Sequence, residues 1–163
     1  MESVYLETSV VSYLRQRPSS NVVAAARQVL THRWWRDEKK KFAIYSSQFV
    51  MDEASAGNAE LAAERLRLLE DIPLLPLDQL VAEIAEEIMN RAVLPEKART
   101  DALHIAVAVR HRVQYLLTWN CRHIANARIT PRLRNVIADL GLQLPVICTP
   151  EELLSDDSHD DND

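Results

Sequence analysis

The sequence predicts an α/β fold with three layers, in which helices cover both faces of a central parallel sheet of about four to five strands. Short apolar runs rich in β-branched residues alternate along the chain with longer segments of helical periodicity. Strands that alternate with helices in this way form parallel sheets. The chain has 163 residues, of which 47% are apolar and 26% charged, enough for one domain with a proper hydrophobic core.

Five apolar runs have the length and composition of short strands. Most are bounded by charged, proline or serine residues, which favour turns and caps over a continued strand. The predicted strands are residues 4–6, 42–45, 73–77, 115–118 and 145–148.

Helical segments are predicted between and after these strands. Ser46–Ser47 and Asp78 are suited to cap two of them, and Gly57 and Gly141 are suited to end two of them. The predicted helices are residues 10–14, 21–40, 48–56, 59–70, 78–89, a segment that begins at Pro95, and a segment within 124–140.

The net charge of −5 comes from the end of the chain. Residues 155–163 contain five aspartates and neither lysine nor arginine, and the rest of the chain has 19 acidic and 19 basic residues. We therefore expect a folded domain over residues 1–154 and a disordered acidic tail over 155–163. Because the domain is neutral, any surface that binds nucleic acid must be local.

Several classes of protein are excluded by what the sequence lacks. Cys121 and Cys148 are too few and too far apart for a disulfide framework or a structural zinc site, which suits a reducing cytoplasm. Glu2 and Glu7 interrupt any N-terminal signal, and no apolar run reaches the roughly 18 residues of a membrane helix, so we expect no membrane association. Only two glycines are present, and neither a dinucleotide-binding nor a P-loop motif occurs.

Glu7 is the first candidate site residue. It follows the predicted strand 4–6 directly and precedes Thr8 and Ser9, which are typical helix-capping residues. Its carboxylate is therefore expected at the C-terminal edge of a parallel sheet, where ligands bind in open α/β folds. The alternative is that Glu7 only complements the positive end of the following helix.

Glu53 is the second candidate. It lies three to four residues after Phe49 and Val50 and is expected on the same, inward face of its helix, whereas Asp52 is expected to face solvent. A carboxylate on a buried face needs a partner, because an unpaired buried charge is costly. That partner could be a metal ion or an arginine.

Asp101 lies in an otherwise apolar helical segment. It would cap the helix if the helix began at Thr100, or lie within the helix and need a charge partner if the helix began at Pro95. Arg99 is one candidate for that partner. His104, one turn further on, is either a metal ligand or a core histidine with satisfied hydrogen bonds.

Asn120 follows the predicted strand 115–118, as Glu7 follows the first strand. An asparagine here is often only a cap, but its amide can also hold a metal-bound water or a phosphate. We expect Glu7, Glu53, Asp101 and Asn120 to converge at one edge of the sheet. Carboxylates so close repel unless a cation neutralises them, and an all-oxygen ligand set favours Mg²⁺ or Mn²⁺. Such a site suits metal-assisted hydrolysis of a phosphodiester.

These residues, in this order and in this α/β spacing, resemble a PIN domain, and within that superfamily the VapC-like ribonucleases. The resemblance extends over roughly residues 3–150 and implies the PIN fold, Mg²⁺- or Mn²⁺-dependent cleavage of RNA, and the role of toxin in a toxin–antitoxin pair. It also implies a homodimer and a cognate antitoxin that inhibits it. The motifs that carry the resemblance are residues 6–9, Glu53, residues 100–106 and residues 116–120.

The resemblance assigns roles to single residues. Glu7 matches the first acid of the family, which is usually aspartate, Glu53 matches the second, and Asp101 the third. Asn120 stands where many members have a fourth acid, so a tightly held second metal is in doubt. Two hydroxyl residues, Thr8 and Thr118, match positions that support the acids.

The basic residues that follow the fourth predicted strand are the best candidates for RNA contacts. They lie closest in the sequence to the expected acidic edge: Arg122, His123 and Arg128, with Arg132 and Arg134 beyond them. A second candidate surface is residues 33–41, where Trp34 and Trp35 could stack on bases. The alternative is one tryptophan in the core beside a solvated basic helix end.

Three functions remain open from the sequence. The first is a metal-dependent ribonuclease of the VapC type, and the second is a catalytically weak PIN-like module that binds protein or RNA. The third is an unrelated α/β phosphohydrolase, which is disfavoured because Glu7 is followed by Thr8 and Ser9 and no acid pair of the DxD type occurs there.

Overall fold

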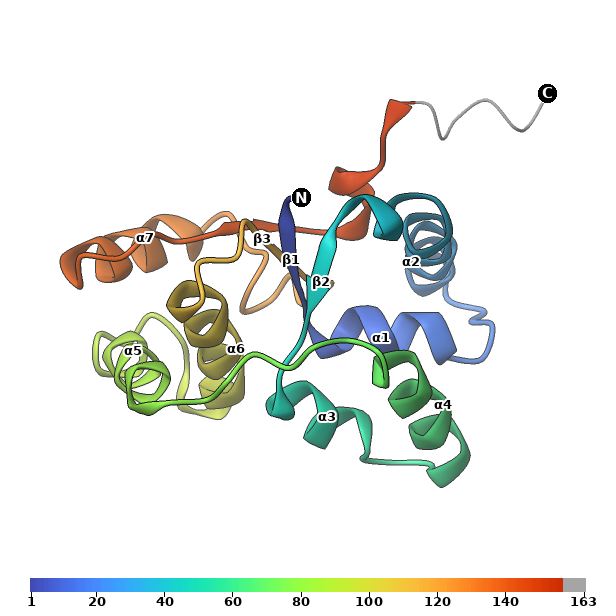
Figure 1. The fold of residues 1–163 in the computed structure, drawn as a ribbon, viewed down its shortest axis with the longest axis horizontal. Coiled ribbons are helices and arrows are strands. Elements are labelled where there is room, and N and C mark those ends of the chain that lie inside the picture. Colours follow the sequence, from blue (N-terminus) through green and yellow to red (C-terminus); the bar gives the residue numbers. More distant parts are fainter. Residues whose placement is uncertain (157–163) are drawn as a thin grey trace.

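A computed structural model describes residues 1–156 and shows a parallel sheet of four strands (Figure 1). The strand order is β2-β1-β3-β4, with β1 in the interior of the sheet. Val4 of β1 lies beside Ile44 of β2 and Tyr115 of β3. The strands are β1 (Ser3–Leu6), β2 (Ala43–Tyr45), β3 (Tyr115–Leu117) and β4 (Val146–Cys148).

In the described part of the chain, seven α-helices flank the sheet and confirm the predicted three-layer α/β/α fold. In Figure 1, helices α5, α6 and α7 lie on one side of the strands, and α1 to α4 lie on the other. The helices are α1 (Thr8–Arg15), α2 (Val22–Arg33), α3 (Gln48–Ala54), α4 (Ala59–Leu69), α5 (Gln79–Asn90), α6 (Arg99–Arg110) and α7 (Thr130–Asp139).

The core is built around the two central strands and α6. Val4, Tyr5 and Leu6 of β1 have no exposed surface, nor do Leu116 and Leu117 of β3. Helix α6 is buried continuously over residues 104–109, as its apolar sequence predicts. Residues that project from the ends of these elements therefore start from a rigid frame.

The predicted strand over residues 73–77 is wrong. In this segment only Leu74 forms a bridge, with Ser46 just beyond β2. Pro73 and Pro76 have no N–H to donate, so a continuous ladder cannot form here. The strand number is therefore four rather than five.

The predicted helix over residues 21–40 is interrupted. Helix α2 ends at Arg33, and a π-helix (Trp34–Glu38) and a 3₁₀ turn (Lys39–Lys41) follow. Trp34 and Glu38 are both buried in this stretch, and Trp34 stacks on Phe42. The prediction missed the break because it depends on burying these side chains, which helical periodicity does not report.

The predicted helix after β3 also begins later than expected. Residues 121–129 form successive turns, and α7 starts at Thr130. Asn126 holds these turns, since its Nδ2 donates to the Cys121 carbonyl at 2.9 Å. Gly141 ends this region with φ of +73°, the left-handed conformation expected of a helix-stopping glycine.

The last described residues pack against the π-helix. Ser155, which the sequence assigns to the acidic tail, donates its hydroxyl to Glu38 Oε1 at 2.6 Å. Lys41 pairs with the other Glu38 oxygen at 2.8 Å. The predicted tail otherwise falls on residues 157–163, which lie outside the described residues. Within residues 1–156, no helix has the length and apolar character required to cross a membrane.

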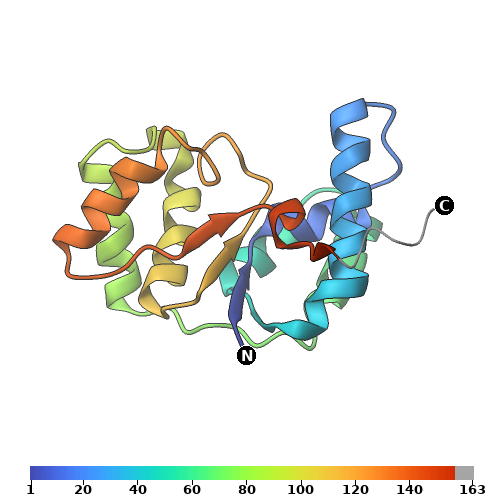
Figure 2. The same ribbon diagram turned by 90° about the horizontal axis from the view of Figure 1, so that it is seen from above.

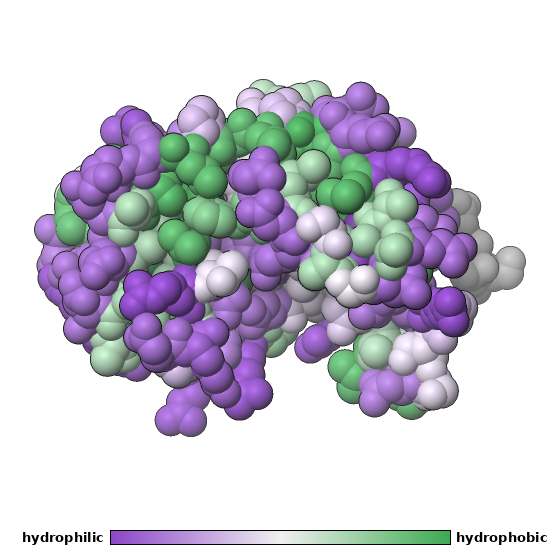
Figure 3. All heavy atoms as spheres, turned by 90° about the horizontal axis from the view of Figure 1, so that it is seen from below, coloured by the Kyte–Doolittle hydropathy of each residue, from purple (hydrophilic) through white to green (hydrophobic). Residues whose placement is uncertain are grey.

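The C-terminal edge of the sheet lies between two raised parts of the molecule. Figure 2 shows α2 standing up on one side of this edge and the group of α5, α6 and α7 on the other. The space-filling view in Figure 3 shows that the surface is hollowed between two lobes. The predicted site residues follow β1 and β3 at this edge.

Candidate active site

Glu7 lies at the end of β1 and caps α1. Its Oε2 accepts hydrogen bonds from Ser9 N at 3.1 Å, from Ser9 Oγ, and from Thr118 Oγ1 at 2.7 Å. The side chain is almost fully buried. Within residues 1–156 no hydrogen bond reaches Oε1, so the capping role uses one carboxylate oxygen and leaves the other open.

Two backbone N–H groups orient the hydroxyls that bind Glu7. Ser9 Oγ accepts from Trp119 N at 2.8 Å, and Thr118 Oγ1 accepts from Asn120 N at 2.9 Å. Each hydroxyl accepts from a backbone N–H through its oxygen and has a single hydrogen to donate. Ser9 Oγ and Thr118 Oγ1 both donate that hydrogen to Glu7. The end of β3 therefore fixes the carboxylate at the end of β1.

Glu53 projects from α3 toward Glu7 and uses one oxygen in the same way. Its Oε1 accepts from Thr8 Oγ1 at 2.8 Å and is hydrogen-bonded to His104 Nε2, and within the described residues Oε2 has no partner. No arginine pairs with it in that part of the chain. The side chain is 39% exposed, so the expectation of a buried inward face is wrong. Glu53 is exposed because it lies at the end of the short helix α3, close to solvent. Only its carboxylate is directed toward the interior, where it meets His104 and Thr8.

The pKa of the Glu53 carboxyl is lower than that of an ordinary glutamate side chain. Burial raises its pKa, but the hydrogen bond and charge of His104, with the Thr8 hydrogen bond, outweigh this effect and lower the pKa below the ordinary value of 4.5. Ionised Glu53 therefore contributes stability above that value, and the contribution is lost as the pH falls through the lowered pKa.

Glu53→Gln should consequently destabilise the protein at neutral pH and have progressively less effect in acid. We expect the difference in urea midpoint between Glu53→Gln and the parent to shrink from pH 7 toward pH 3. Glu60→Gln, at an exposed position on α4, is the matched control and should shift the midpoint little at any pH. A Glu53→Gln difference that stays constant with pH would contradict the lowered pKa.

His104 is fully buried, and both ring nitrogens have partners. Nε2 bonds Glu53, and Nδ1 lies 2.8 Å from the Tyr5 hydroxyl. The interpretation as a satisfied core histidine therefore fits this geometry better than that of a metal ligand, since no ring nitrogen is free. Ligand-type atoms of Glu7, Glu53 and His104 all lie within 4.8 Å of one another.

Asp101 is in the first turn of α6, which neither sequence alternative described. Ala98 occupies the N-cap position, and a 3₁₀ turn (Glu96–Ala98) separates Pro95 from the helix. Arg99 pairs with Glu96 at 2.8 Å instead of with Asp101.

Asn120 and His123 hold the Asp101 carboxylate. Asn120 Nδ2 donates to Oδ1 at 3.1 Å, and His123 Nδ1 lies 3.1 Å from Oδ2. Asn120 Oδ1 accepts from His123 N at 3.0 Å, so Asn120 also fixes the turn that carries His123.

The four predicted site residues thus form two linked groups. Glu7 and Glu53 belong to the cluster within 4.8 Å, and Asp101 is not part of that cluster within the described chain. Asp101 is joined to it by hydrogen bonds, through Asn120 and then Thr118, to Glu7. Thr8 and Thr118 each donate to one of the glutamates, as supporting hydroxyls would.

The basic residues after β3 lie in different environments. Arg122 and Arg128 are exposed, whereas His123 is tied to Asp101. Arg132 donates to the Ala92 carbonyl at 2.8 Å. Trp34 is in the core, and the Lys39 ammonium lies 4.1 Å from the Trp35 ring centre, which supports the alternative of a core tryptophan beside a basic helix end.

Arg27 of α2 is a cation near the site that sequence reasoning missed. Its guanidinium lies over the ring of Trp119, 5.2 Å from the centre, and its Nη2 is 3.8 Å from Cys121 Sγ. None of the ion pairs among residues 1–156 involves Arg27. No local sequence pattern marks Arg27, because the contact joins α2 to the turn after β3.

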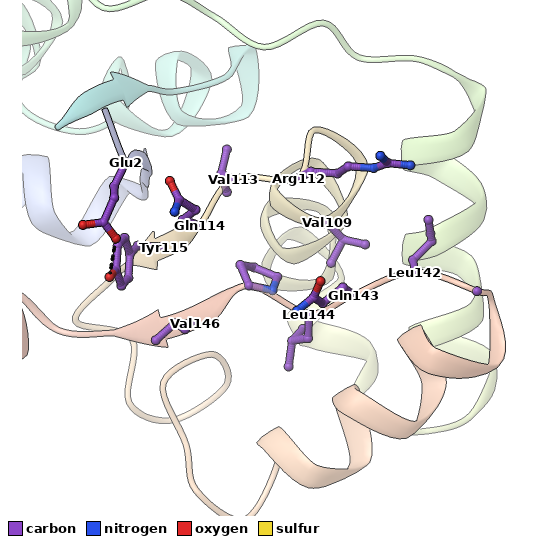
Figure 4. Close-up of a pocket in the computed structure, with 12 residues that line it drawn as sticks. Glu2, Val109, Arg112, Val113, Gln114, Tyr115, Leu142, Gln143, Leu144 and Val146 are labelled. Carbon is purple, nitrogen blue, oxygen red and sulfur yellow. Dashed lines mark hydrogen bonds between the residues drawn. The ribbon is translucent and has the colours of Figure 1, made fainter.

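A separate cavity of about 570 Å³ opens at the opposite edge of the sheet, where the strands begin (Figure 4). Its lining includes Glu2, Tyr115 and Val146, and the Tyr115 hydroxyl donates to Glu2 Oε2 at 2.7 Å. None of the predicted site residues lines this cavity, so it is distinct from the cluster of acids.

Comparison with known families agrees with this arrangement. The PIN domain family model matches residues 4–128, most of the chain, including Glu7, Glu53, Asp101 and Asn120. This chain belongs to the PIN domain family. PIN domains are generally nucleases, and Glu7 and Glu53 of this PIN domain form an acidic cluster suited to a metal ion.

The fold of this PIN domain is similar to that of a solved structure. A chain of the crystal structure of VapBC2 from Rickettsia felis, bound to a DNA fragment from their promoter, matches with a TM-score of 0.53 and 13% identity. The match covers 90% of this PIN domain and 98% of that chain. A comparison with curated protein sequences gave no match.

Proposed function

We propose that this PIN domain is a divalent-metal-dependent endoribonuclease that hydrolyses RNA phosphodiester bonds. The observation that carries the proposal is the approach of Glu7 and Glu53 at the C-terminal edge of the sheet. Both are held by hydroxyl or imidazole groups, no arginine or lysine in the described chain pairs with either, and each keeps one oxygen open. Family membership supports nuclease activity, and the proposal adds the metal and the RNA substrate.

The donor set fits Mg²⁺ or Mn²⁺. Glu7 and Glu53 each offer a hard carboxylate oxygen without a hydrogen bond in the described chain, and the nearby His104 has no free nitrogen to favour a softer metal. When bound, such an ion supplies polarisation of the phosphate and activation of water. Without a cation, two carboxylates this close would repel each other.

Asp101 and Asn120 complete the proposed catalytic set. The Asp101 carboxylate accepts hydrogen bonds from Asn120 and His123. It therefore lies beside Asn120 at the edge of the site. We assign Asp101 to orienting water or a metal-bound ligand, and Asn120 to holding Asp101. Exposed Arg122 and Arg128, together with Arg27 over Trp119, would contact RNA phosphates.

Cleavage of a mixed RNA pool tests this proposal. We expect cleavage with Mn²⁺ or Mg²⁺, none with excess EDTA, and recovery when the metal is restored. Binding of RNA without cleavage at any metal concentration would contradict it and favour the second candidate, a catalytically weak PIN-like binding module. The observation that favours that candidate is Asn120, which replaces an acid.

We propose further that this protein is the toxin of a VapBC-like pair, acts in the cytoplasm as a homodimer and is inhibited by a cognate antitoxin. The structural neighbour VapBC2 supports the pairing. Helix α2 also exposes Val22, Val23 and Val29 at 82%, 60% and 59%, an apolar surface of the kind that protein partners cover. A small protein encoded next to this chain should co-purify with it and suppress its cleavage of RNA. An unchanged rate of RNA cleavage in the presence of that protein would contradict the pairing.

Asn120→Asp tests the assignment of the fourth position. The change replaces the amide that donates to Asp101 by a fourth carboxylate near the site. We expect lower thermal stability without metal, because the donor is lost and like charges meet, and tighter Mn²⁺ binding, because a charged ligand is gained. Calorimetric titration with Mn²⁺ measures the second effect. Weaker Mn²⁺ binding than in the parent would show that position 120 does not face the metal.

A further inference from the structure

We propose that His104 is a positioning residue for Glu53, and that a buried hydrogen-bond relay from Ser47 through Tyr5 to His104 holds the Glu53 carboxylate with Oε2 open to the metal. The inference rests on the proposed function and deepens it. It assigns a role to the buried polar side chains of Ser47, Tyr5 and His104, which are not themselves proposed metal ligands.

The relay is continuous and closed to solvent. The Tyr5 hydroxyl lies 2.7 Å from Ser47 Oγ and 2.8 Å from His104 Nδ1, and His104 Nε2 bonds Glu53 Oε1. Tyr5, Ser47 and His104 have no exposed surface. Burial raises the pKa of Tyr5 far above its ordinary value, which the Ser47 hydrogen bond only partly offsets, so the hydroxyl keeps its hydrogen.

The donor at the Glu53 end of the relay is fixed. An ionised carboxylate only accepts, so Nε2 must carry the hydrogen that bonds Glu53. The Tyr5 hydroxyl can both donate and accept, and it bonds Nδ1 on one side and Ser47 Oγ on the other. Every polar group of the relay therefore has a partner.

The relay also closes a loop through the fold. Ser47 is the N-cap residue of α3, and Glu53 lies on the same helix one and a half turns later. Between them, Tyr5 belongs to β1 and His104 to α6. The seven-residue helix α3 is thereby tied at one end to β1 and at the other to α6, both of which belong to the core.

Glu53 needs such a restraint more than Glu7 does. Its side chain is 39% exposed, and among residues 1–156 only the Thr8 hydroxyl and His104 form hydrogen bonds with its carboxylate. Without His104, rotation about the side-chain bonds would take the carboxylate away from Glu7 into solvent. Outer partners that orient a ligand in this way commonly affect metal affinity 10- to 100-fold.

Two substitutions of His104 separate its two contacts. Gln places an amide donor roughly where Nε2 lies and keeps the bond to Glu53, whereas Asn reaches only the position of Nδ1 and loses that bond. With Mn²⁺ alone as the probe, calorimetric titration should show binding weakened on the order of 10- to 100-fold in His104→Asn. His104→Gln should bind Mn²⁺ more tightly than His104→Asn.

Tyr5→Phe provides a second test that keeps the size of the side chain. It removes the hydroxyl that bonds His104 Nδ1 and helps to hold the imidazole ring in place, and we expect Mn²⁺ binding to weaken, to a smaller extent than in His104→Asn. Tyr115→Phe removes a tyrosine hydroxyl that bonds Glu2 at the other edge of the sheet, and should leave Mn²⁺ affinity unchanged. If His104→Asn fails to fold, Tyr5→Phe carries the test.

A purely structural role would predict a different pattern. Ile137→Val shortens a fully buried side chain of α7 and lowers the melting temperature without touching the acids. If the relay variants lost only melting temperature, as Ile137→Val does, and kept the parent's Mn²⁺ affinity, the positioning role would be overturned.

The failure of this inference can be told apart from that of the proposed function. Glu7→Gln removes a proposed ligand directly. Loss of Mn²⁺ binding in Glu7→Gln, with unchanged affinity in His104→Asn and Tyr5→Phe, would overturn the relay and keep the nuclease site. Absence of Mn²⁺ binding in the parent protein would overturn both.

Discussion

Asp101→Asn is expected to lower the rate of RNA cleavage more than about 100-fold, beyond the 10- to 100-fold cost typical of losing an outer partner of a metal site. The change keeps the size of the side chain but places an NH₂ group against Asn120 Nδ2 or His123 Nδ1, both of which now contact carboxylate oxygens. The negative charge at this position is lost as well. The measurement is the initial rate on an RNA substrate with Mn²⁺, at equal concentrations of the parent and the variant.

Asp52→Asn is the matched control for Asp101→Asn. Asp52 lies beside Glu53 in the sequence but is exposed, and its carboxylate accepts a hydrogen bond from Gln48 Nε2 at 2.9 Å. We expect its cleavage rate to equal that of the parent. Equal rates in Asp101→Asn and the parent would point to a contaminating nuclease or to a different site.

Thr118→Val is expected to damage both stability and activity. Valine has the shape of threonine without the hydroxyl, so Glu7 loses a donor and Asn120 N loses its acceptor in a fully buried environment. Leaving a buried group unsatisfied costs about 1–3 kcal/mol, and we expect a loss of that size in the free energy of unfolding. Cleavage should fall roughly 10- to 100-fold, since the Glu7 carboxylate loses one of the two hydroxyls that hold it.

Thr130→Val separates these effects from a general effect of the substitution. Thr130 donates to the Asn126 carbonyl at 2.9 Å at the start of α7, away from the acids. Urea unfolding and cleavage rates measured side by side decide the matter. A Thr118→Val protein with full activity would show that this hydroxyl does not support Glu7 during catalysis.

The fold and part of the site could be predicted because they depend on local patterns. The apolar run before Glu7 and the one before Asn120 mark strands, and parallel strands bring their C-terminal ends to one edge. The placement of Glu7 and the contact between Thr118 and Glu7 follow from that geometry. The prediction of a strand at residues 73–77 is wrong, because it relies on apolar composition. The two prolines in this segment prevent a continuous ladder, and only one bridge forms.

The partners of the acids could not be predicted because they come from remote parts of the chain. Glu53 meets His104 across 51 residues, and Tyr5 meets His104 across 99. The sequence left open an arginine partner for Glu53 and a metal role for His104. Only the packing of α3 against α6 shows that these two residues satisfy each other, and the same holds for Arg27 over Trp119.

The most direct test of the central claim is an anomalous difference map from a crystal of this protein soaked in Mn²⁺. We predict a peak bound by Glu7 Oε1 and Glu53 Oε2, the two carboxylate oxygens that have no hydrogen bond within residues 1–156, with Asp101 or its water as a neighbour. A map in which Mn²⁺ binds elsewhere, while both glutamates keep only their present hydrogen-bond partners, would contradict the proposed metal centre and the nuclease that depends on it.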